Sequence, residues 1–255
     1  MRTIIVGDVH GCRAELEGLL DRVAFASGDR LVFVGDLVAR GPDSLGVLDV
    51  ARRTGAIVVR GNHEQKLLDW RRERNAWMRG EAGAKPPIGK MHRDIARSLR
   101  PVDWTLLETS PLFLDLPEHG ARVVHAGLLP GIAFEEQSPQ TLMRIRTVRV
   151  PGKRRGRLRA KPTNVLWGAT YDGPPQVVFG HNAAPGLQLH RWATGLDTGC
   201  VYGGCLTAMV LASGQRIPRV LAARRALLVA EPAARVWFAP AARTVAAPVR
   251  PNRST

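Results

Sequence analysis

The sequence has few cysteines and no long hydrophobic run. The first absence argues against a disulfide-stabilised protein, and the second against a membrane-spanning one. Its 255 residues contain three cysteines, at positions 12, 200 and 205, an odd and sparse set without the paired spacing of a metal motif or disulfide framework. Such a set is typical of a reducing compartment. The apolar run at residues 4–6 is too short for a signal sequence, and no later run approaches membrane-spanning length. We therefore expect a cytoplasmic protein with no membrane association and no obligate protein partner.

Acidic residues are also scarce, since 22 Asp and Glu stand against 37 Lys and Arg, giving a net charge of +15. The excess lies in two segments, residues 144–161 with nine Lys or Arg and residues 216–255 with eight Arg and one Glu. The rest of the chain is close to neutral. Residues 144–161 have two interpretations, a solvated basic loop or an arginine-rich flap over a crevice that receives phosphate charges. Residues 239–255 are expected to form a disordered basic tail.

Apolar residues alternate along the chain with the periods of strands and helices. The first part reads strand, helix, strand, helix, strand, helix, with strands at 2–7, 31–34 and 56–59 and helices at 13–24, from 42–44 and from about 64. Residues 81–87 read as a loop and residues 91–109 as helical, with Pro101 starting a second helix. Later strands are expected at 121–125, 176–180, 193–197 and 205–212, with a loop at 150–162. This order predicts a layered α/β domain.

Metal-ligating side chains follow five of these strands. The motifs are Gly-Asp-Val-His-Gly at 7–11, Gly-Asp-Leu-Val-Ala-Arg-Gly at 35–41, Gly-Asn-His-Glu at 61–64, and the histidines at 125 and 181. The carboxyl edge of an open α/β sheet is where ligands bind, so these side chains should converge. A bridging carboxylate can hold two ions about 3.5–4 Å apart, and mixed Asp, His and Asn ligands favour Mn²⁺, Fe²⁺, Co²⁺ or Zn²⁺ over Ca²⁺.

With these motifs in this order, the chain resembles the metallophosphoesterases of the phosphoprotein-phosphatase superfamily over roughly residues 3–212. The family motifs are GDxHG, GDxxxRG, GNHE/D, HxG and GH. The resemblance implies a four-layer α/β/β/α sandwich over residues 1–238, with a two-metal site at the strand ends. It implies two divalent cations as cofactors, with Mn²⁺ expected first.

The same resemblance implies a role for each matching residue. The first metal would be held by Asp8 and His10, with Asp36 as the bridge. The second metal would be held by Asn62, His125 and His181. His63 would be the general acid, Arg40 and Arg60 would bind the phosphate, and Tyr202 would lie near the substrate.

One position departs from the protein-phosphatase branch, where an Asp precedes the Arg of the second motif and pairs with the histidine acid. Here that position is Ala39. The strings at 35–42, 195–200, 203–204 and 206–207 are instead similar to bacterial symmetrical diadenosine-tetraphosphate hydrolases, in which a metal-bridging hydroxide releases two ADP. We hypothesise that a phosphoanhydride leaving group needs less help from a proton donor than a serine alkoxide does.

Two other functions remain open at this point. One is a protein Ser/Thr or Tyr phosphatase on the same site, and the other is decapping or binding of RNA 5′ ends, drawn by the basic segments. Residues outside the motifs are expected to be structural. His92, His119 and His190 would be surface or hydrogen-bonded histidines, and Cys12 a buried thiol. Asp197 could approach the metal centre or shape a turn, and the turn is favoured.

Overall fold

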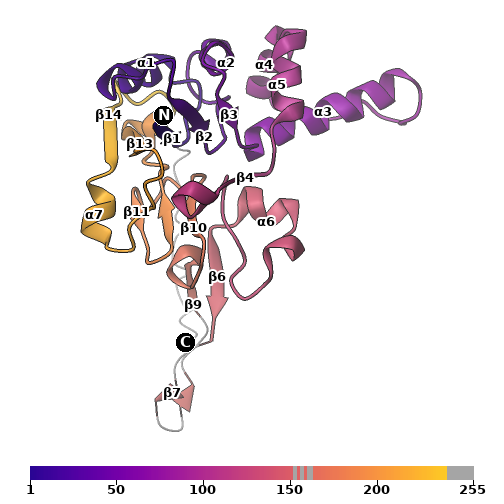
Figure 1. The fold of residues 1–255 in the computed structure, drawn as a ribbon. Helices are drawn as coiled ribbons and strands as arrows, with labels where there is room; N and C mark the ends of the chain where they lie inside the picture. The colour runs from indigo at the N-terminus through magenta and orange to yellow at the C-terminus, as the bar shows by residue number, and fades with distance from the viewer. Residues whose placement is uncertain (152–153, 156–157, 160–162, 240–255) are drawn as a thin grey trace, which may run out of the picture.

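The computed structural model describes residues 1–151, 154–155, 158–159 and 163–239. Its first part alternates strands and helices as the sequence predicts (Figure 1). These elements are β1 (Thr3–Val6), α1 (Arg13–Arg22), β2 (Arg30–Phe33), α2 (Ser44–Arg53), β3 (Ile57–Val58) and α3 (Asn62–Met78). The predicted start of α2 is confirmed, because the Asp43 carboxylate accepts a hydrogen bond of 2.7 Å from the Gly46 amide and caps the helix.

Two five-stranded sheets form the centre of the molecule. The first has the order β14-β13-β1-β2-β3, with β1, β2 and β3 parallel; β13 is Cys205–Leu211 and β14 is Leu228–Pro232. The second has the order β11-β12-β10-β5-β4, with β5, β10 and β12 parallel. Its strands are β4 (Phe113–Leu116), β5 (Ala121–Val124), β10 (Gln176–Phe179), β11 (Gln188–Leu189) and β12 (Ala193–Gly195).

The alternation of side chains along the strands explains the layers. Ile4 and Val6 of β1 pack with the helices over the first sheet, whereas Ile5 between them packs with Val123 and Val178 of the second sheet. On the far face of the second sheet, Phe179 packs with residues of α6 (Pro139–Arg144) and the short 3₁₀ turn Trp167–Ala169. The expected four-layer α/β/β/α sandwich is confirmed, with a fourth layer made of short helical pieces.

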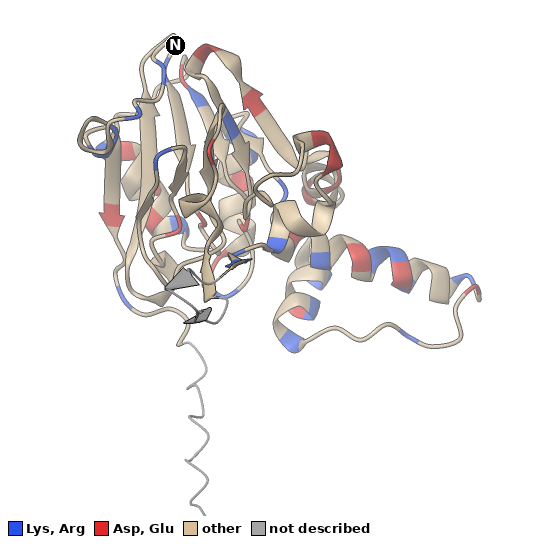
Figure 2. Ribbon diagram, turned by 90° about the horizontal axis from the view of Figure 1, so that it is seen from below, with Lys and Arg blue, Asp and Glu red and all other residues tan. Residues whose placement is uncertain are grey.

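A helical arm projects from this body. It consists of α3 and its following loop, α4 (Lys90–Ser98) and α5 (Pro101–Thr109), and Figure 2 shows it extending to one side. Pro101 starts α5, as the sequence predicts. The base of α3 stays in the body because Leu67 is buried there, and the helix then leaves the core and exposes Trp77.

Other elements were not evident from the pattern. Strand β6 (Thr147–Val150) pairs with β9 (Thr163–Leu166), and β7 (Arg154–Arg155) pairs with β8 (Leu158–Arg159). The expected loop at 150–162 is therefore wrong for its described part, because strands paired by backbone hydrogen bonds need no apolar periodicity. The helix α7 (Leu221–Arg225) and β14 were likewise not predicted.

Two expectations concern the end of the chain and the membrane. Residues 240–255 of the predicted tail lie outside the described residues. Before them, the Trp237 indole nitrogen donates a hydrogen bond of 2.7 Å to Glu15, which attaches this segment to α1. Among the described residues, no helix combines the length and the apolar content that a membrane span requires.

Candidate metal centre

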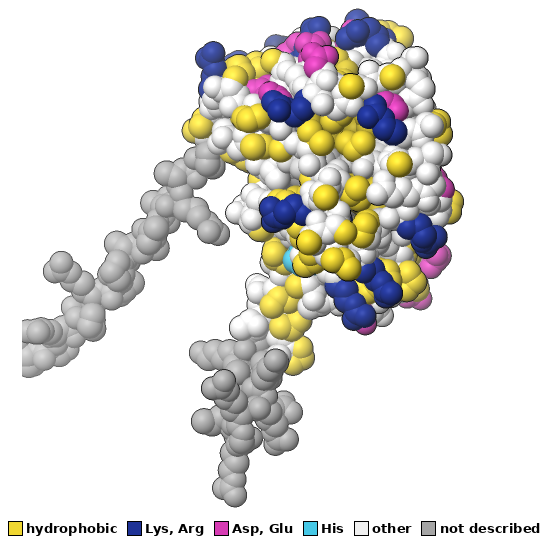
Figure 3. Space-filling view, turned by 60° about the vertical axis from the view of Figure 1, so that its left-hand side comes forward, with side chains coloured by type: hydrophobic (Ala, Val, Ile, Leu, Met, Phe, Trp, Pro, Cys, Tyr) yellow, Lys and Arg dark blue, Asp and Glu magenta, His cyan; other side chains and the backbone are white. Residues whose placement is uncertain are grey.

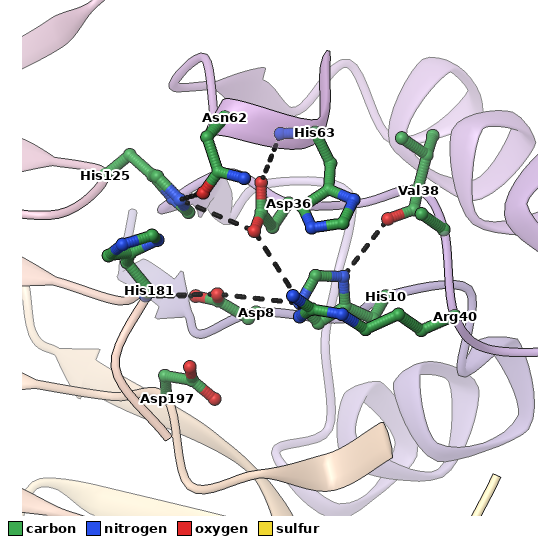
Figure 4. A network of polar contacts seen from close by, with 12 residues as sticks. Asp8, His10, Asp36, Val38, Arg40, Asn62, His63, His125, His181 and Asp197 are labelled. Carbon is green, nitrogen blue, oxygen red and sulfur yellow. Dashed lines mark hydrogen bonds and ion pairs between the residues drawn. The ribbon is translucent and has the colours of Figure 1, made fainter. Parts of the chain in front are cut away.

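The parallel strands deliver five of the predicted metal ligands to one place, where their side chains point toward one another (Figure 4). Asp8 and Asp36 follow β1 and β2, and Asn62 begins α3 just after β3. From the second sheet, His125 follows β5 and His181 follows β10. His10 joins them from the turn after β1. The structure thus brings all six predicted ligands together, although they span most of the chain.

Asp36 lies between two groups of ligands. Its Oδ2 atom is 3.6 Å from His10 Nε2 on one side and 3.5 Å from His125 Nε2 on the other. Asn62 Oδ1 lies 3.2 Å from the same His125 nitrogen. Atoms that ligate one ion each lie about 2 Å from it, so separations of this size between them fit a shared cation. Asp36 with His10 and His63, and Asp36 with His125 and His181, each form such a group.

Backbone carbonyls fix the orientation of two imidazoles. His10 Nδ1 lies 3.1 Å from the Val38 carbonyl oxygen, and His125 Nδ1 lies 3.0 Å from that of Val34. Because a carbonyl only accepts, each Nδ1 must carry the hydrogen, and Nε2 faces Asp36. Burial lowers the pKa of His10 to about 4, which leaves its Nε2 lone pair free for a metal.

Several buried carboxylates share this small volume. Burial raises the pKa of Asp8 well above its usual value, and the neighbouring Asp197 and Asp36 raise it further. Burial also opposes ionisation of Asp36, but His125 and His63 hold its pKa well below its usual value. Burial opposes protonation of His125, yet Asp36 and Asp8 raise its pKa to about 10. The cluster therefore requires positive charge, and divalent cations held by these oxygens and nitrogens would supply it.

The backbone around the ligands is constrained. His10, Asp36 and His181 have φ values of 48°, 50° and 69°, in the left-handed region that non-glycine residues seldom adopt. The amide of His181 donates to both carboxylate oxygens of Asp8, at 3.1 and 3.0 Å. Gly180 permits this approach because a Cβ atom there would overlap the Asp8 carboxylate. The cluster is thus formed by strained turns in mutual contact.

Glu64 organises the Asp36 turn, a role that sequence reasoning missed. Its buried carboxylate accepts hydrogen bonds of 2.9–3.2 Å from the amides of Asp36, Leu37 and Val38, and one of 2.9 Å from Gly61. Four donors on one carboxylate tie the turn after β2 to the start of α3. Its place after His63 in the third motif was the only available signal.

His63 lies beside the cluster and contacts a second histidine. Its backbone amide donates a hydrogen bond of 2.9 Å to Asp36 Oδ1, and its Nδ1 lies 3.0 Å from Nε2 of His92 on α4. Burial lowers the pKa of His63 to about 3 and that of His92 to about 4. Ala39, where the protein-phosphatase branch has an Asp, is fully buried and offers no carboxylate. The expectation that His92 is hydrogen-bonded is confirmed, and a surface position is wrong because α4 packs it against α3.

A cavity of about 500 Å³ opens beside the cluster. Arg40, Tyr202 and His181 line it, and so does Arg146, which lies just before β6. The Arg40 guanidinium contacts His10 Nε2 and lies 5.6 Å from the centre of the Tyr202 ring. Residues 144–161 thus bring at least one arginine to the crevice, as the flap interpretation requires. The sequence could not indicate which arginine this would be.

Arg60 and Asp197 lie in surroundings that differ from those expected from the sequence. The Arg60 guanidinium donates to the Glu108 carbonyl oxygen at 2.9 Å and to Gln65 at 3.2 Å, and it lines a different surface pocket. Asp197 accepts a hydrogen bond of 3.1 Å from the Gly199 amide, as a turn former does, but it also lines the crevice below Asp8. The structure therefore keeps Arg60 apart from the cluster and adds Asp197 to it.

The remaining residues outside the motifs behave as structural ones. His119 bonds to Thr3 and to the Gln215 carbonyl, and His190 contacts Gln188 at 3.2 Å. Cys12 is fully buried, as expected for a small apolar thiol. These outcomes confirm the structural interpretation of those three side chains.

Comparisons with known proteins show a family match and several relatives. A sequence profile described as "Calcineurin-like phosphoesterase" matches residues 1–204. The chain is 33% identical to a symmetrical bis(5′-nucleosyl)-tetraphosphatase of Chromohalobacter salexigens, over 84% of this chain and 96% of that one. It is 30% identical to an asymmetrical enzyme of that name, PrpE of Halalkalibacterium halodurans, over 82% and 89%. A solved structure of a candidate diadenosine tetraphosphatase is similar with a TM-score of 0.69 and 35% identity, over 91% of this chain and 93% of that chain.

Proposed function

This chain belongs to the calcineurin-like phosphoesterase family, and on that premise we propose that it hydrolyses diadenosine tetraphosphate and related dinucleoside polyphosphates in the cytoplasm. The observation that carries the proposal is the buried cluster around Asp36 at the strand ends, which opens into a crevice lined by Arg40, Arg146 and Tyr202. Relatives named as bis(5′-nucleosyl)-tetraphosphatases cover most of the chain and support the substrate class.

Two divalent cations would be the cofactors. Asp8, His10 and Asp36 would hold one, and Asp36, Asn62, His125 and His181 the other. Such ions would activate water and neutralise phosphate charge. The mixed donor set suits Mn²⁺, with Co²⁺, Fe²⁺ and Zn²⁺ as further candidates.

The chain's own residues would orient the substrate. Arg40, at the edge of both cluster and crevice, would bind a phosphate oxygen, and Arg146 on the opposite segment would bind the next phosphate. Tyr202 would contact the nucleoside, since its ring lines the crevice beside Arg40. Arg60 would bind phosphate only after leaving the Glu108 carbonyl. The crevice volume is within the roughly 300–1,000 Å³ range of small-molecule sites.

His63 would face the leaving group as the proton donor. In this chain its partner is the neutral side chain of His92 rather than a carboxylate, because residue 39 is Ala. An imidazole partner orients His63 but stabilises an imidazolium less than a carboxylate would. A weaker donor suits an ADP leaving group, whose terminal phosphate departs without strong proton donation. This argument favours phosphoanhydride over phosphoprotein substrates.

We further propose symmetrical cleavage to two ADP. The curated relatives include both symmetrical and asymmetrical enzymes, so product identity is the deciding observation. The symmetrical assignment is supported by the strings around Ala39 and at 195–200, and by a symmetrical relative matched over 96% of its length.

Ion-exchange analysis of products tests this proposal directly. The protein would be incubated with diadenosine tetraphosphate and Mn²⁺ or Co²⁺, alongside an Asp36→Asn variant and the exposed control Asp172→Asn. A single ADP peak, lost with chelator and in Asp36→Asn but kept in the control, is expected. AMP with ATP would overturn the symmetrical assignment. No turnover together with rapid cleavage of phosphopeptides or of capped RNA would overturn the substrate class.

A further inference from the structure

The helical arm encloses a second cavity that is separate from the metal centre. Its volume is about 700 Å³, and its walls come from α3, residues 85–88, α4 and Trp104 of α5. Five of the lining side chains are Arg or Lys and none is Asp or Glu. Four of these cations, Arg74, Lys85, Arg93 and Arg97, come from three different segments of the chain. The cavity is therefore a concentration of positive charge.

The cations of this wall differ from most of the others on the same arm. Among the described residues, no ion pair within 4.0 Å joins a carboxylate to any of those four. Elsewhere on the arm, Arg72 pairs with Asp69 at 3.0 Å, Arg79 with Glu81 at 2.7 Å and Lys90 with Asp94 at 2.8 Å. Because these neighbouring cations have carboxylate partners and the four cations of the cavity wall do not, the wall carries uncompensated positive charge.

Another face of the molecule has a different arrangement of charge. On the face formed by α1, β14 and α7, Lys and Arg side chains lie apart, among hydrophobic and acidic ones (Figure 3). Arg71, the fifth cation of the cavity, is paired with Glu108 at 2.5 Å and covers the Trp104 ring at 4.5 Å. Its charge is thus compensated, and the four unpaired cations remain for a ligand.

An apolar part of the wall lies next to these cations. It consists of Trp70 together with Pro86, Pro87 and Ile88. The indole nitrogen of Trp70 is buried and has no hydrogen-bond acceptor among the described residues. The Arg74 guanidinium lies 5.7 Å from the centre of the Trp70 ring, so a positive charge and an aromatic surface are adjacent in the cavity wall.

We propose that this cavity binds a nucleoside polyphosphate. The phosphates would contact Arg74, Lys85, Arg93 and Arg97, and the base would pack against Trp70 and the segment 86–88. A triphosphate carries about as many negative charges as the wall has unpaired cations, and the volume fits one nucleotide. A cavity lined by four segments of one arm favours a single nucleotide over a nucleic-acid strand, which would need an extended groove. The proposal does not depend on which reaction the metal centre performs.

Calorimetric titration with ATP tests the charged part of the site. We would use full-length Asp36→Asn protein with chelator present, so that neither metal binding nor hydrolysis contributes. Replacing Arg74 and Arg97 with Gln should weaken ATP binding about 10-fold or more, because two charge-assisted contacts are lost. The matched control replaces Arg72 and Arg79 with Gln, which removes equal charge from the same helical arm and should change affinity less than about 2-fold. Equal weakening by both pairs, or none by the first, would overturn the proposal.

Two further probes identify the ligand class. ATP should bind at least about 10-fold more tightly than inorganic tripolyphosphate, and Trp70→Leu should reduce that preference while thermal unfolding shows an intact fold. Equal affinity for tripolyphosphate would overturn the base contact. Displacement of ATP by a single-stranded RNA decamer at far lower concentration would overturn the nucleotide assignment in favour of nucleic acid.

Discussion

The candidate metal centre and the cavity of the helical arm both concentrate charge, but the charges differ in sign and in how they are held. In the metal centre, buried carboxylates are held by backbone amides, as Asp8 is by His181 and Glu64 by the turn after β2. In the arm, four cations of the cavity wall, Arg74, Lys85, Arg93 and Arg97, have no carboxylate partner among the described residues. Charges fixed by backbone at strand ends can position reacting groups. Charges on flexible side chains of helices are suited to binding an anion of opposite charge.

The two regions meet at α4. His92 on this helix contacts His63 at the metal centre, and the adjacent Arg93 lines the arm cavity. The following predictions test how far the two regions are independent, beginning with the change that should matter most.

Asp36→Asn should abolish the function of the metal centre and leave the arm intact. Loss of the shared carboxylate should reduce hydrolysis of diadenosine tetraphosphate by more than the roughly 100-fold typical of outer-shell changes. Mn²⁺ binding measured by calorimetry should also be lost, because Asp36 contacts both ligand groups. Retention of Mn²⁺ affinity and of activity within 10-fold would show that the centre lies elsewhere. The control Asp172→Asn should behave as wild type.

Glu64→Gln tests whether backbone amides really hold the centre. An amide side chain cannot accept the four hydrogen bonds that the carboxylate accepts. We expect a roughly 10–100-fold loss of metal affinity and activity, with a loss of unfolding free energy of about 1–3 kcal/mol. Denaturant titration and activity assays at saturating Mn²⁺ would separate the two effects. Wild-type metal affinity in this variant would contradict the organising role.

His92→Phe tests the link between the two regions. Because His92 would act only through its contact with His63, turnover should fall about 10-fold, less than the roughly 100-fold expected for His63→Ala. The two substitutions together should be no worse than His63→Ala alone, since both remove one interaction. Additive losses in the double variant would mean that His92 acts separately.

Ala39→Asp tests the choice of leaving group. The φ of 75° at this position is one that Asp tolerates better than most residues. An added carboxylate near His63 should raise phosphoester cleavage relative to phosphoanhydride cleavage, by a factor on the order of 10. The ratio would be measured with a phosphoserine peptide and diadenosine tetraphosphate, with Ala39→Asn as the uncharged control. No change in this ratio would refute the argument from Ala39.

Arg72→Gln should have the smallest effect. Its side chain is 74% exposed and pairs with Asp69 one helical turn away, outside the arm cavity. Exposed pairs of this kind contribute about 0–1 kcal/mol, so thermal stability and hydrolysis should stay within experimental error of wild type. A clear loss of activity would indicate that the arm as a whole, rather than its cavity, supports the metal centre.

Much of the site was predictable because its signals are local. Asp8 and Asp36 each follow a short apolar strand and a glycine, so they could be placed at strand ends from the sequence alone. The helix boundary at Pro101 was likewise local. The edge strand β4 was not predicted, because its residues are mostly exposed or half-buried and show no clear alternation.

Contacts between segments far apart were not predictable. Nothing in the sequence indicated that His92 would reach His63, 29 positions away, or that Arg146 would be the arginine at the crevice. Arg224 shows the same limit: it is fully buried because its guanidinium donates to several backbone carbonyls, including those of Pro218 and His190. No local pattern signals such a position.

The sequence by itself determined which metal-binding side chains exist and that each follows a strand, because side-chain alternation and tight glycine turns depend on neighbouring residues. The tertiary structure alone decided which of them share a volume, that a histidine replaces the missing carboxylate beside His63, and that four arm cations surround one cavity. These outcomes depend on how α3, α4 and the two sheets pack, and packing joins residues that no sequence window contains together.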